Sequence, residues 1–213
     1  GFVIDEEVYV LYALDKPIGR LIENGEILDL KTLSDEIRSI SNFSDSSARI
    51  KLKIPTAVLG LPPLGLEIFQ TQQVTNVVSE DRRIENIDIR NLNALIYKEK
   101  IPLQNVLVGI VPERYILDEE RSSKVAPLGE HSNTITVIAK VHTLPSRIIN
   151  DYQTALTEGG ITLKRSIVAP FAVAELLMTY PEVPADYILV DIGANLTTVS
   201  LIGKSQLYGS NYF

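Results

Sequence analysis

The spacing of apolar residues changes along the chain between the two-residue period of strands and the longer period of helices. Near the start, residues 8–14 have the alternation typical of a strand. Residues 18–28 form a second such run, which is broken by the turn pair Asn24-Gly25. We expect the second run to return as the partner of the first.

A helix and a further strand are predicted next. Thr32 and Asp35 form a capping sequence, and the apolar side of the helix that follows is Leu33, Ile37, Ile40 and Phe43. Residues 52–60 predict a strand. Pro55 indicates that this strand starts late or lies near a sheet edge, because proline has no N–H to donate to a neighbouring strand.

The middle of the chain has a different order of elements. A strand at residues 74–79 precedes a helix capped by Asn86, and two strands follow at 105–117 and 134–144. A charged loop, residues 118–130, separates those two strands, with no helix between them. This order predicts an α+β unit in which the last two strands pair antiparallel.

In the last third, helices and strands alternate again. An apolar stripe over residues 148–156 predicts a helix that stops at Gly159-Gly160, and a short strand follows at 161–168. Residues 171–178 are apolar almost all round, as in a buried helix. Three strands then end the chain, at residues 187–192, 197–202 and 205–212.

Composition excludes several classes of function. With 213 residues, 45% of them hydrophobic, the chain can bury a substantial core. A net charge of −7 without a basic cluster argues against nucleic-acid binding, and the absence of cysteine excludes disulfides. No apolar run could span a membrane and no export leader is visible, so we expect an intracellular protein. His131 and His142 are expected at exposed positions and not at a metal.

The best candidate for chemistry lies where the apolar run 187–192, read as a buried strand, enters a polar turn. Gly193 is expected to free the backbone for this turn. Turn amides with short polar side chains can bind phosphate, and Asp191 can hold a hydrated Mg²⁺. An ordinary hairpin with a polar tip is the alternative interpretation. The candidate ligand-binding residues are Asp191, Gly193, Asn195, Thr197 and Thr198.

Five segments, taken in order, resemble the bacterial cell-division actin homologue FtsA, of the superfamily of actin, sugar kinases and heat-shock chaperone ATPases. No single segment is specific, but together they cover roughly 185 residues in the family's order. The segments are Pro17-Ile-Gly through Gly-Glu-Ile-Leu-Asp29, Ile110-Val-Pro-Glu-Arg-Tyr-Ile-Leu-Asp118, Pro127-Leu-Gly129 with 135–142, Glu158-Gly-Gly-Ile161 with 169–177, and Asp191-Ile-Gly193.

This resemblance implies an α/β fold of the actin-like, ribonuclease-H-like type, incomplete in this chain and carrying an inserted α+β subdomain. Residues 1–70 and 146–182 would form the first actin-like subdomain. Residues 71–145 would be the inserted interaction subdomain. Residues 183–213 would open the second half, with the phosphate-motif hairpin.

The resemblance also implies a role. Proteins of this family form filaments at the inner face of the cell membrane and link the tubulin-like division protein to it, with ATP and Mg²⁺ as a conformational switch. For this chain it implies self-association, partners among division proteins, and only indirect membrane contact. Any ATPase activity would be weak and would belong to the full-length protein.

Two departures from the family's pattern bear on nucleotide binding. The family's second phosphate motif is Asp-x-Gly-Gly-Gly-Thr-x-Asp, whereas here Ala194 and Asn195 replace two glycines and Thr198 stands at the second Asp. The first phosphate motif has only Asp5-Glu6-Glu7 as a candidate, which lacks glycine. We therefore expect a piece of a longer protein, and no bound nucleotide in this piece.

Two other functions fit the sequence less closely. The pilus-assembly relative PilM has a similar Asp-Ile-Gly-Ala turn and recruits an inner-membrane partner through a short peptide, so a PilM-like adaptor is the first alternative. A sugar-kinase-type phosphotransferase is the second. It would need an Asp general base facing a sugar cleft, and no residue here is placed to be one.

Overall fold

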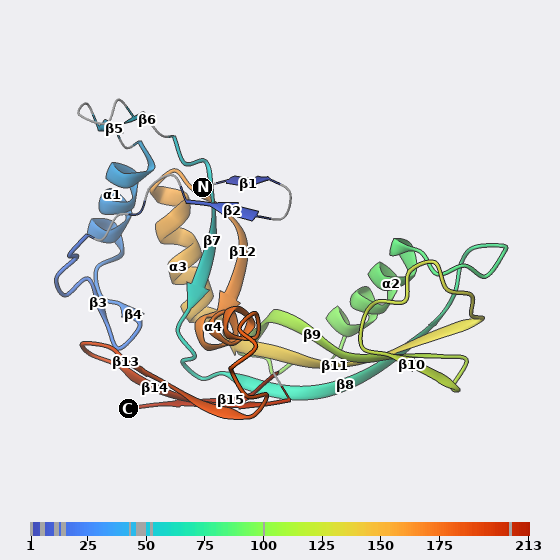
Figure 1. Cartoon of the computed structure of the whole chain (residues 1–213). Helices are drawn as coiled ribbons and strands as arrows, with labels where there is room; N and C mark the ends of the chain where they lie inside the picture. Colours follow the sequence, from blue (N-terminus) through green and yellow to red (C-terminus); the bar gives the residue numbers. More distant parts are fainter. Residues whose placement is uncertain are drawn as a thin grey trace.

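The computed structural model has two parts, a body and a protruding arm (Figure 1). The body holds α1 (Leu30–Ser41), α3 (Ser146–Glu158) and α4 (Ala169–Leu177), and the arm holds α2 (Asn86–Tyr97) on a long sheet. No helix in the described part of the chain is long and apolar enough to cross a membrane. The structure describes residues 2–4, 7–10, 13, 16–42, 44–45, 50–51, 53–99, 101–204 and 206–213.

In the body, a parallel strand pair lies beside two packed helices. β7 (Thr56–Leu61) and β12 (Thr162–Val168) pair in parallel, with Thr56 opposite Thr162. The strand start after Pro55 is therefore confirmed. Helices α1 and α3 lie side by side (Figure 1).

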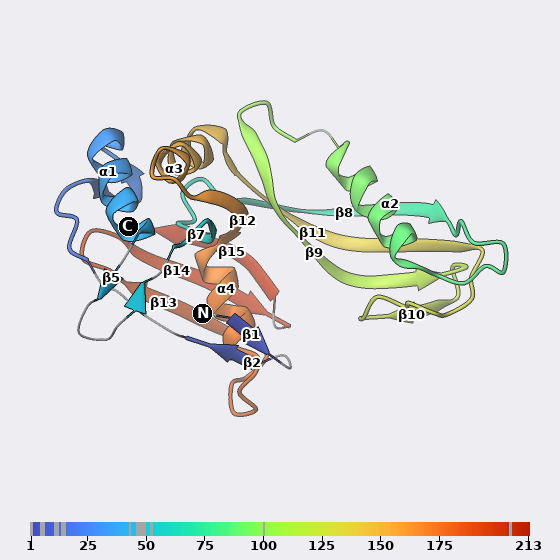
Figure 2. The same cartoon turned by 90° about the horizontal axis from the view of Figure 1, so that it is seen from above.

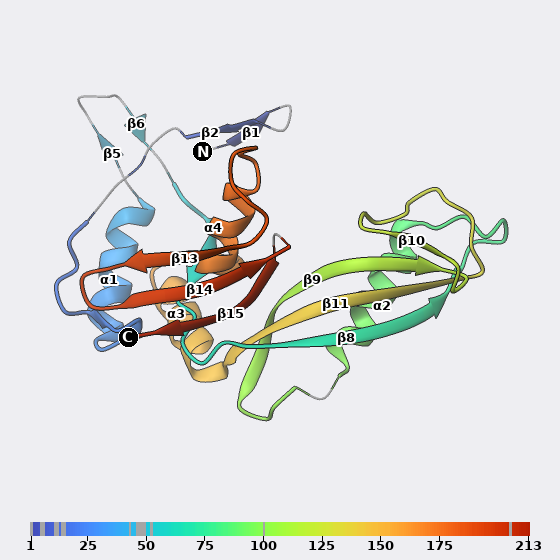
Figure 3. The same ribbon diagram turned by 60° about the horizontal axis from the view of Figure 1, so that its bottom comes forward.

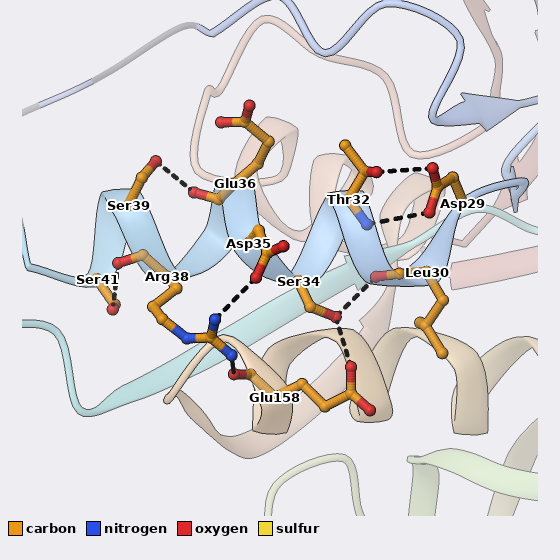
Figure 4. Close-up of polar contacts among 10 residues, drawn as sticks. All are labelled: Asp29, Leu30, Thr32, Ser34, Asp35, Glu36, Arg38, Ser39, Ser41 and Glu158. Atoms are coloured by element: carbon orange, nitrogen blue, oxygen red, sulfur yellow. Dashed lines mark hydrogen bonds and ion pairs between the residues drawn. The ribbon is translucent and has the colours of Figure 1, made fainter.

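Helix α1 begins earlier than its sequence indicated. The N-cap is Asp29, whose carboxylate accepts a hydrogen bond of 3.0 Å from the Thr32 backbone N–H and one of 2.7 Å from its hydroxyl (Figure 4). The prediction of a cap at Thr32 was wrong, because an Asp three residues upstream supplies the same kind of acceptor. At the other side of the helix, Ser34 and Arg38 bind the carboxylate and carbonyl of Glu158, which ties α1 to the end of α3.

Helix α3 ends where the glycine pair predicted. Gly159 is the C-cap and Gly160 adopts the left-handed conformation, with φ at +83°. The Ile161 N–H then bonds the Leu156 carbonyl at 2.8 Å, and the Gly160 N–H bonds the Thr157 carbonyl at 3.0 Å. These two bonds close a Schellman motif.

The N-terminal pairing differs from the prediction. Residues 18–28 do not pair with residues 8–10 and 13, the part of the first run that the structure describes. They fold on themselves, as β3 (Ile22–Glu23) and β4 (Glu26–Ile27), around Asn24-Gly25. Both turn residues have positive φ, +50° and +79°, so the local turn alone is sufficient to close a hairpin. Elsewhere, β1 (Phe2–Ile4) pairs with β2 (Glu7–Tyr9), and β5 (Ser44–Asp45) with β6 (Ile50–Lys51).

The arm is a four-stranded sheet with one helix on it, and we call it the lobe. Its strand order is β10-β9-β11-β8. The predicted antiparallel pairing of 105–117 with 134–144 is confirmed, since β11 pairs with β9. The division of the chain into domains stays a prediction. The strands are β8 (Glu67–Asn76), β9 (Asn105–Leu117), β10 (Arg121–Ser123) and β11 (Thr134–Pro145).

Two details of the lobe were missed. The strand predicted at 74–79 is β8, which starts at Glu67. Its first part was missed because Gln70, Gln72 and Gln73 interrupt the apolar pattern, and pairing with β11 stabilises the strand there. The predicted loop 118–130 contains β10, and Asp118 is fixed there. Its carboxylate accepts bonds of 2.9 Å from the backbone N–H groups of Asn133 and Thr134.

The N-terminus of α2 is held by one buried carboxylate. The N-cap is Glu85, one residue before the predicted Asn86. Asp88 is fully buried, and its two oxygens accept the backbone N–H groups of Glu85, at 2.8 Å, and Val78, at 3.0 Å. Because Val78 follows β8, this single side chain joins the end of that strand to the helix.

Strand β11 is covered on both faces. One face, with Ile135, Val137 and Val141, packs in a core with Leu92 and Ile96 of α2. The opposite face meets the body near its C-terminal end, where Leu144 joins a core cluster with Leu61 of β7 and Val168 of β12. The lobe and the body therefore share one continuous strand.

A third sheet, of order β13-β14-β15, lies across the base of the lobe (Figure 3). Ile202 and Leu207 of this sheet pack with Ala174 of α4, and Leu66 and Ile68 lie against the same cluster. Helix α4 is not buried all round as predicted: Val173, Leu176 and Met178 are at least two-fifths exposed. The sheet's strands are β13 (Tyr187–Ile192), β14 (Thr197–Gly203) and β15 (Gln206–Tyr212).

His142 joins the lobe to α4 and is not exposed as predicted. It is 2% exposed, and its ring meets Phe171 edge-on at 5.2 Å between centroids. Burial, together with the charge of Lys140, lowers the pKa of His142 from 6.5 to about 4. The folded protein therefore keeps this imidazole neutral at pH values where the unfolded chain binds a proton.

We expect stability to fall as the pH drops from about 6.5 to 4, and the His142→Leu variant to lose this part of the dependence. A shift of this size corresponds to about 3 kcal/mol across that window, with the full contribution present above the unfolded pKa. Urea unfolding at several pH values measures it. His131→Gln, at an exposed position, is the matched control. Equal pH slopes for wild type and His142→Leu would contradict the prediction.

Gly159 is also required by packing between helices. A Cβ at this position would lie 2.8 Å from the Ile37 Cβ of α1. Gly159→Ala should therefore lower the free energy of unfolding by about 1–3 kcal/mol, as overpacked cores do. Gly60→Ala in β7 is the control, because its Cβ would meet nothing within 4 Å. Denaturant melts that show the two variants equally stable would contradict this account.

Candidate functional site

The predicted phosphate turn connects β13 and β14 at residues 193–196. Asp191 pairs with Thr198 and Ile192 with Thr197, so the hairpin stays in register up to the turn. The structure thus brings the candidate residues together at one end of the third sheet. Asp191, Gly193 and Asn195 are exposed there, Thr197 is half-buried, and Thr198 is only 7% exposed.

Gly193 is needed for a reason other than the predicted one. Its backbone is not in the left-handed region, so conformational freedom does not explain it. Its N–H donates to the Leu196 carbonyl at 3.0 Å, and a Cβ would lie 2.8 Å from that same oxygen. The turn closes too tightly for a side chain at this position.

Two amides of the turn region already have partners. The Gly193 N–H is bonded to Leu196, and the Thr197 N–H donates to the Phe213 carbonyl at 3.1 Å. Phe213 returns a bond of 2.9 Å to the Thr197 carbonyl, which makes this pair an extension of the β14–β15 ladder. A phosphate at this turn would have to use Ala194, Asn195 and the side-chain hydroxyls.

Asp191, the acidic residue beside the turn, could bind only a metal ion that keeps most of its water ligands. Asp191 is exposed, and no cluster of three or more His, Cys, Asp or Glu that could hold a metal occurs in the part of the chain that the structure describes. Mg²⁺ commonly binds through one or two carboxylates, with water and substrate phosphate completing its shell. The turn fits such a partial site, in which Asp191 would hold the hydrated ion. The alternative first motif at Asp5-Glu6-Glu7 lies mostly outside the described residues.

Strand β13 is not the buried strand that its sequence indicated. It is the edge of its sheet, and Ile188, Val190 and Ile192 are 64%, 51% and 80% exposed. Leu201 pairs with Ile188 and is 56% exposed on the same face. The strand was predicted with its correct bounds, but one of its two faces is uncovered here.

A second site was not predicted from the sequence. A cavity of about 620 Å³ lies between the lobe sheet and the β14–β15 hairpin. Lys140 within the apolar segment 137–141 is a local sign of an unusual position, but it does not locate a cavity. The cavity is lined by Gln70, Glu113, Arg114, Lys124, Ile138, Lys140, Lys204, Gln206 and Tyr208.

The fold is actin-like. The solved structure of a PilM–PilN type IV pilus biogenesis complex contains a chain that superposes on 93% of this chain with a TM-score of 0.50. This chain covers 52% of that one, and the two sequences are 16% identical. The likeness defines the class, an actin-fold protein with an inserted lobe, and no more than the fold.

Sequence similarity gives the particular relatives. The chain matches the cell division protein FtsA of Enterococcus faecalis at 25% identity and that of Streptococcus pneumoniae at 24%, each over 87% of its length. FtsA of Bacillus subtilis matches at 21%. The resemblance to FtsA is thereby confirmed. The chain spans only about two-fifths of the length of these curated relatives. No family model matches it.

Proposed function

We propose that this chain is the N-terminal portion of an FtsA-like scaffold of bacterial cell division. The observation that carries the proposal is the similarity to FtsA over 87% of the chain, which extends through the inserted lobe. The scaffold would polymerise and link the tubulin-like division protein to the inner face of the membrane. The actin-like fold supports a filament-forming protein of this kind.

The lobe is the part of the chain best built for contacts with other proteins. At its tip, Val78, Ile87 and Leu128 are 63%, 43% and 48% exposed. Ile87 and Leu128 line one surface depression together with Arg83 and Glu85. Exposed apolar side chains rimmed by charges are typical of protein interfaces. We propose that this tip contacts a neighbouring protomer or a division protein.

ATP would act as a conformational switch in the full-length protein, bound with Mg²⁺ between the two halves. The turn at 193–196 would supply one phosphate contact, with Asp191 holding the hydrated Mg²⁺. What supports this is the position of the exposed Asp191 carboxylate beside a tight glycine turn. We expect any hydrolysis by the full-length protein to be weak.

A PilM-like adaptor is the alternative. The likeness to a chain of the PilM–PilN complex and the Asp191-Ile-Gly-Ala turn favour it. An adaptor of that type would recruit an inner-membrane partner by binding a short peptide. The neighbouring genes distinguish the two, because a tubulin-like division gene would support the first and a pilus operon the second.

We expect this 213-residue chain to bind Mg-ATP weakly or not at all, because one turn offers few contacts and no adenine pocket. In the full-length protein, Asp191→Ala should weaken Mg-ATP binding at least tenfold by removing the carboxylate that faces the ion. Calorimetry measures both. Asn211→Ala, on the neighbouring strand, is the control.

Micromolar affinity of the 213-residue chain would show that the adenine site has been misplaced. An unchanged affinity in full-length Asp191→Ala would leave the turn as an ordinary hairpin tip.

The lobe tip gives a separate test. Ile87→Lys with Leu128→Lys should reduce filament formation or partner binding of the full-length protein at least tenfold, because both side chains lose an apolar contact. Sedimentation and pull-down with purified division proteins measure this. Glu119→Lys with Glu120→Lys is the matched control, since exposed loop charges contribute little to stability.

A deletion tests the whole lobe. Thr71 pairs with Ala139, so residues 72–138 can be replaced by a short linker at this point of the sheet. This cut keeps Ile68, His142 and Leu144, which pack against the body. If the deleted protein still formed filaments and bound its partners, the lobe would have no role in assembly.

A further inference from the structure

One side of the cavity between the lobe sheet and the β14–β15 hairpin is formed by neighbouring residues on three paired strands of the lobe. Gln70 of β8 pairs with Lys140 of β11, and Ile138 pairs with Arg114 of β9. A register shift between Ile138 and Ala139 leaves Glu113 as an extra residue in β9. Such a bulge re-aims a side chain, and here Glu113 lines the cavity beside Arg114.

The third sheet forms the opposite wall. Lys204, Gln206 and Tyr208 come from the turn and first residues of the β14–β15 hairpin, and β15 lies beside β8 (Figure 1). Lys124 follows β10 and closes a third side. The cavity is therefore shared by both sheets and belongs to neither alone.

Lys140 is the unusual residue of this cavity. It is 6% exposed, and its Nζ lies 3.1 Å from the centre of the Tyr208 ring and 3.6 Å from Glu113 Oε1. Its Nζ nevertheless has no hydrogen-bond partner among the described residues, although an ammonium carries three donors. A buried charge without hydrogen bonds is costly, so such a group is normally completed by something that accepts them.

The charge around Lys140 is far from balanced. Arg114, Lys124 and Lys204 also line the cavity, and none of these three forms an ion pair within the described residues. Among the described residues that line the cavity, Glu113 is the only acidic one, and its second oxygen accepts from Gln70. Four cations thus face one carboxylate, in a chain whose net charge is −7.

We propose that this cavity binds a compact polyanion, a soluble molecule that carries phosphate or carboxylate groups. Guanidinium and ammonium groups are the side chains that bind such anions most strongly. A volume of about 620 Å³ is that of a small-molecule site. The ligand would bridge Arg114 of the lobe to Lys204 of the third sheet, and it would reach the Lys140 donors after a shift of the Tyr208 ring that lies over them.

This site is separate from the proposed nucleotide turn. Lys204 follows the C-terminal end of β14, whereas residues 193–196 precede its N-terminal end. The proposal therefore does not depend on ATP binding, and variants at the two ends of β14 distinguish the two sites.

Calorimetry of the 213-residue chain with pyrophosphate and with citrate, both without Mg²⁺, tests the proposal. We expect at least one of these probes to bind, with an affinity that falls steeply as salt is raised. Lys140→Met should weaken binding at least tenfold. Arg114→Gln with Lys124→Gln changes only exposed side chains, so it should do the same in a protein that folds normally. Pyrophosphate alone or citrate alone would identify the anionic group.

Two controls separate this site from others. Lys164→Met removes an exposed lysine outside the cavity and should leave binding unchanged. Asp191→Ala should also leave it unchanged. The proposal is overturned if neither probe binds, if binding survives both cavity variants, or if it is lost in Asp191→Ala. Binding of an acidic peptide but of neither probe would also overturn it, in favour of a protein-docking surface.

Discussion

The structure depends on β11 being buried along nearly its whole length. Every residue from Ile135 to Leu144 is buried, so this strand supplies core to the lobe on one face and to the body on the other. A strand covered on both faces can carry only a few polar groups, and each needs a compensating arrangement. Thr143 bonds Asn105 and the Glu67 carbonyl, His142 stays neutral, and Lys140 lies between Glu113 and the Tyr208 ring at the cavity. The unusual settings of His142 and Lys140 thus follow from one architectural requirement.

Much of the fold could be predicted because local signals agreed with tertiary packing. The bounds of β9 were predicted to the residue, and those of β11 and β13 to β15 within one residue, because apolar and β-branched runs between polar turns mark most of these strands. Gly159-Gly160 ended α3 as expected, since a left-handed residue was available. Strand β8 was misplaced because three glutamines interrupt its pattern, and the strand exists through its pairing with β11. Residues 18–28 form their own hairpin because Asn24 and Gly25 adopt the positive φ values of a tight turn, which pairs the residues on either side of it.

The hairpin that carries the candidate residues was predicted in position, whereas its role in binding stays a prediction. The sequence placed Asp191 and Gly193 at a hairpin end, and register alone is sufficient for that. It could not show that the Thr197 backbone is bonded to Phe213. Phe213 lies one residue beyond the predicted last strand, and the bond depends on how that strand pairs. The cationic cavity was beyond sequence reasoning for the same reason. Its lysines and arginine come from four separated segments, and only the packing of one sheet on another brings them together.

The parallel pair of β7 and β12 has a kinetic consequence. Thr56 and Thr162 meet only after the whole intervening segment has been accommodated, so this pairing is strongly non-local. Once β8 and β11 have paired, Glu67 and Thr143 are held together. The residues between them then no longer add to the flexible loop that connects β7 to β12. Reducing the loop from roughly 100 to roughly 25 flexible residues lowers its closure cost by about 1.2 kcal/mol, two halvings of length. A lobe that folded first would therefore make the pairing of β7 with β12 easier by this amount.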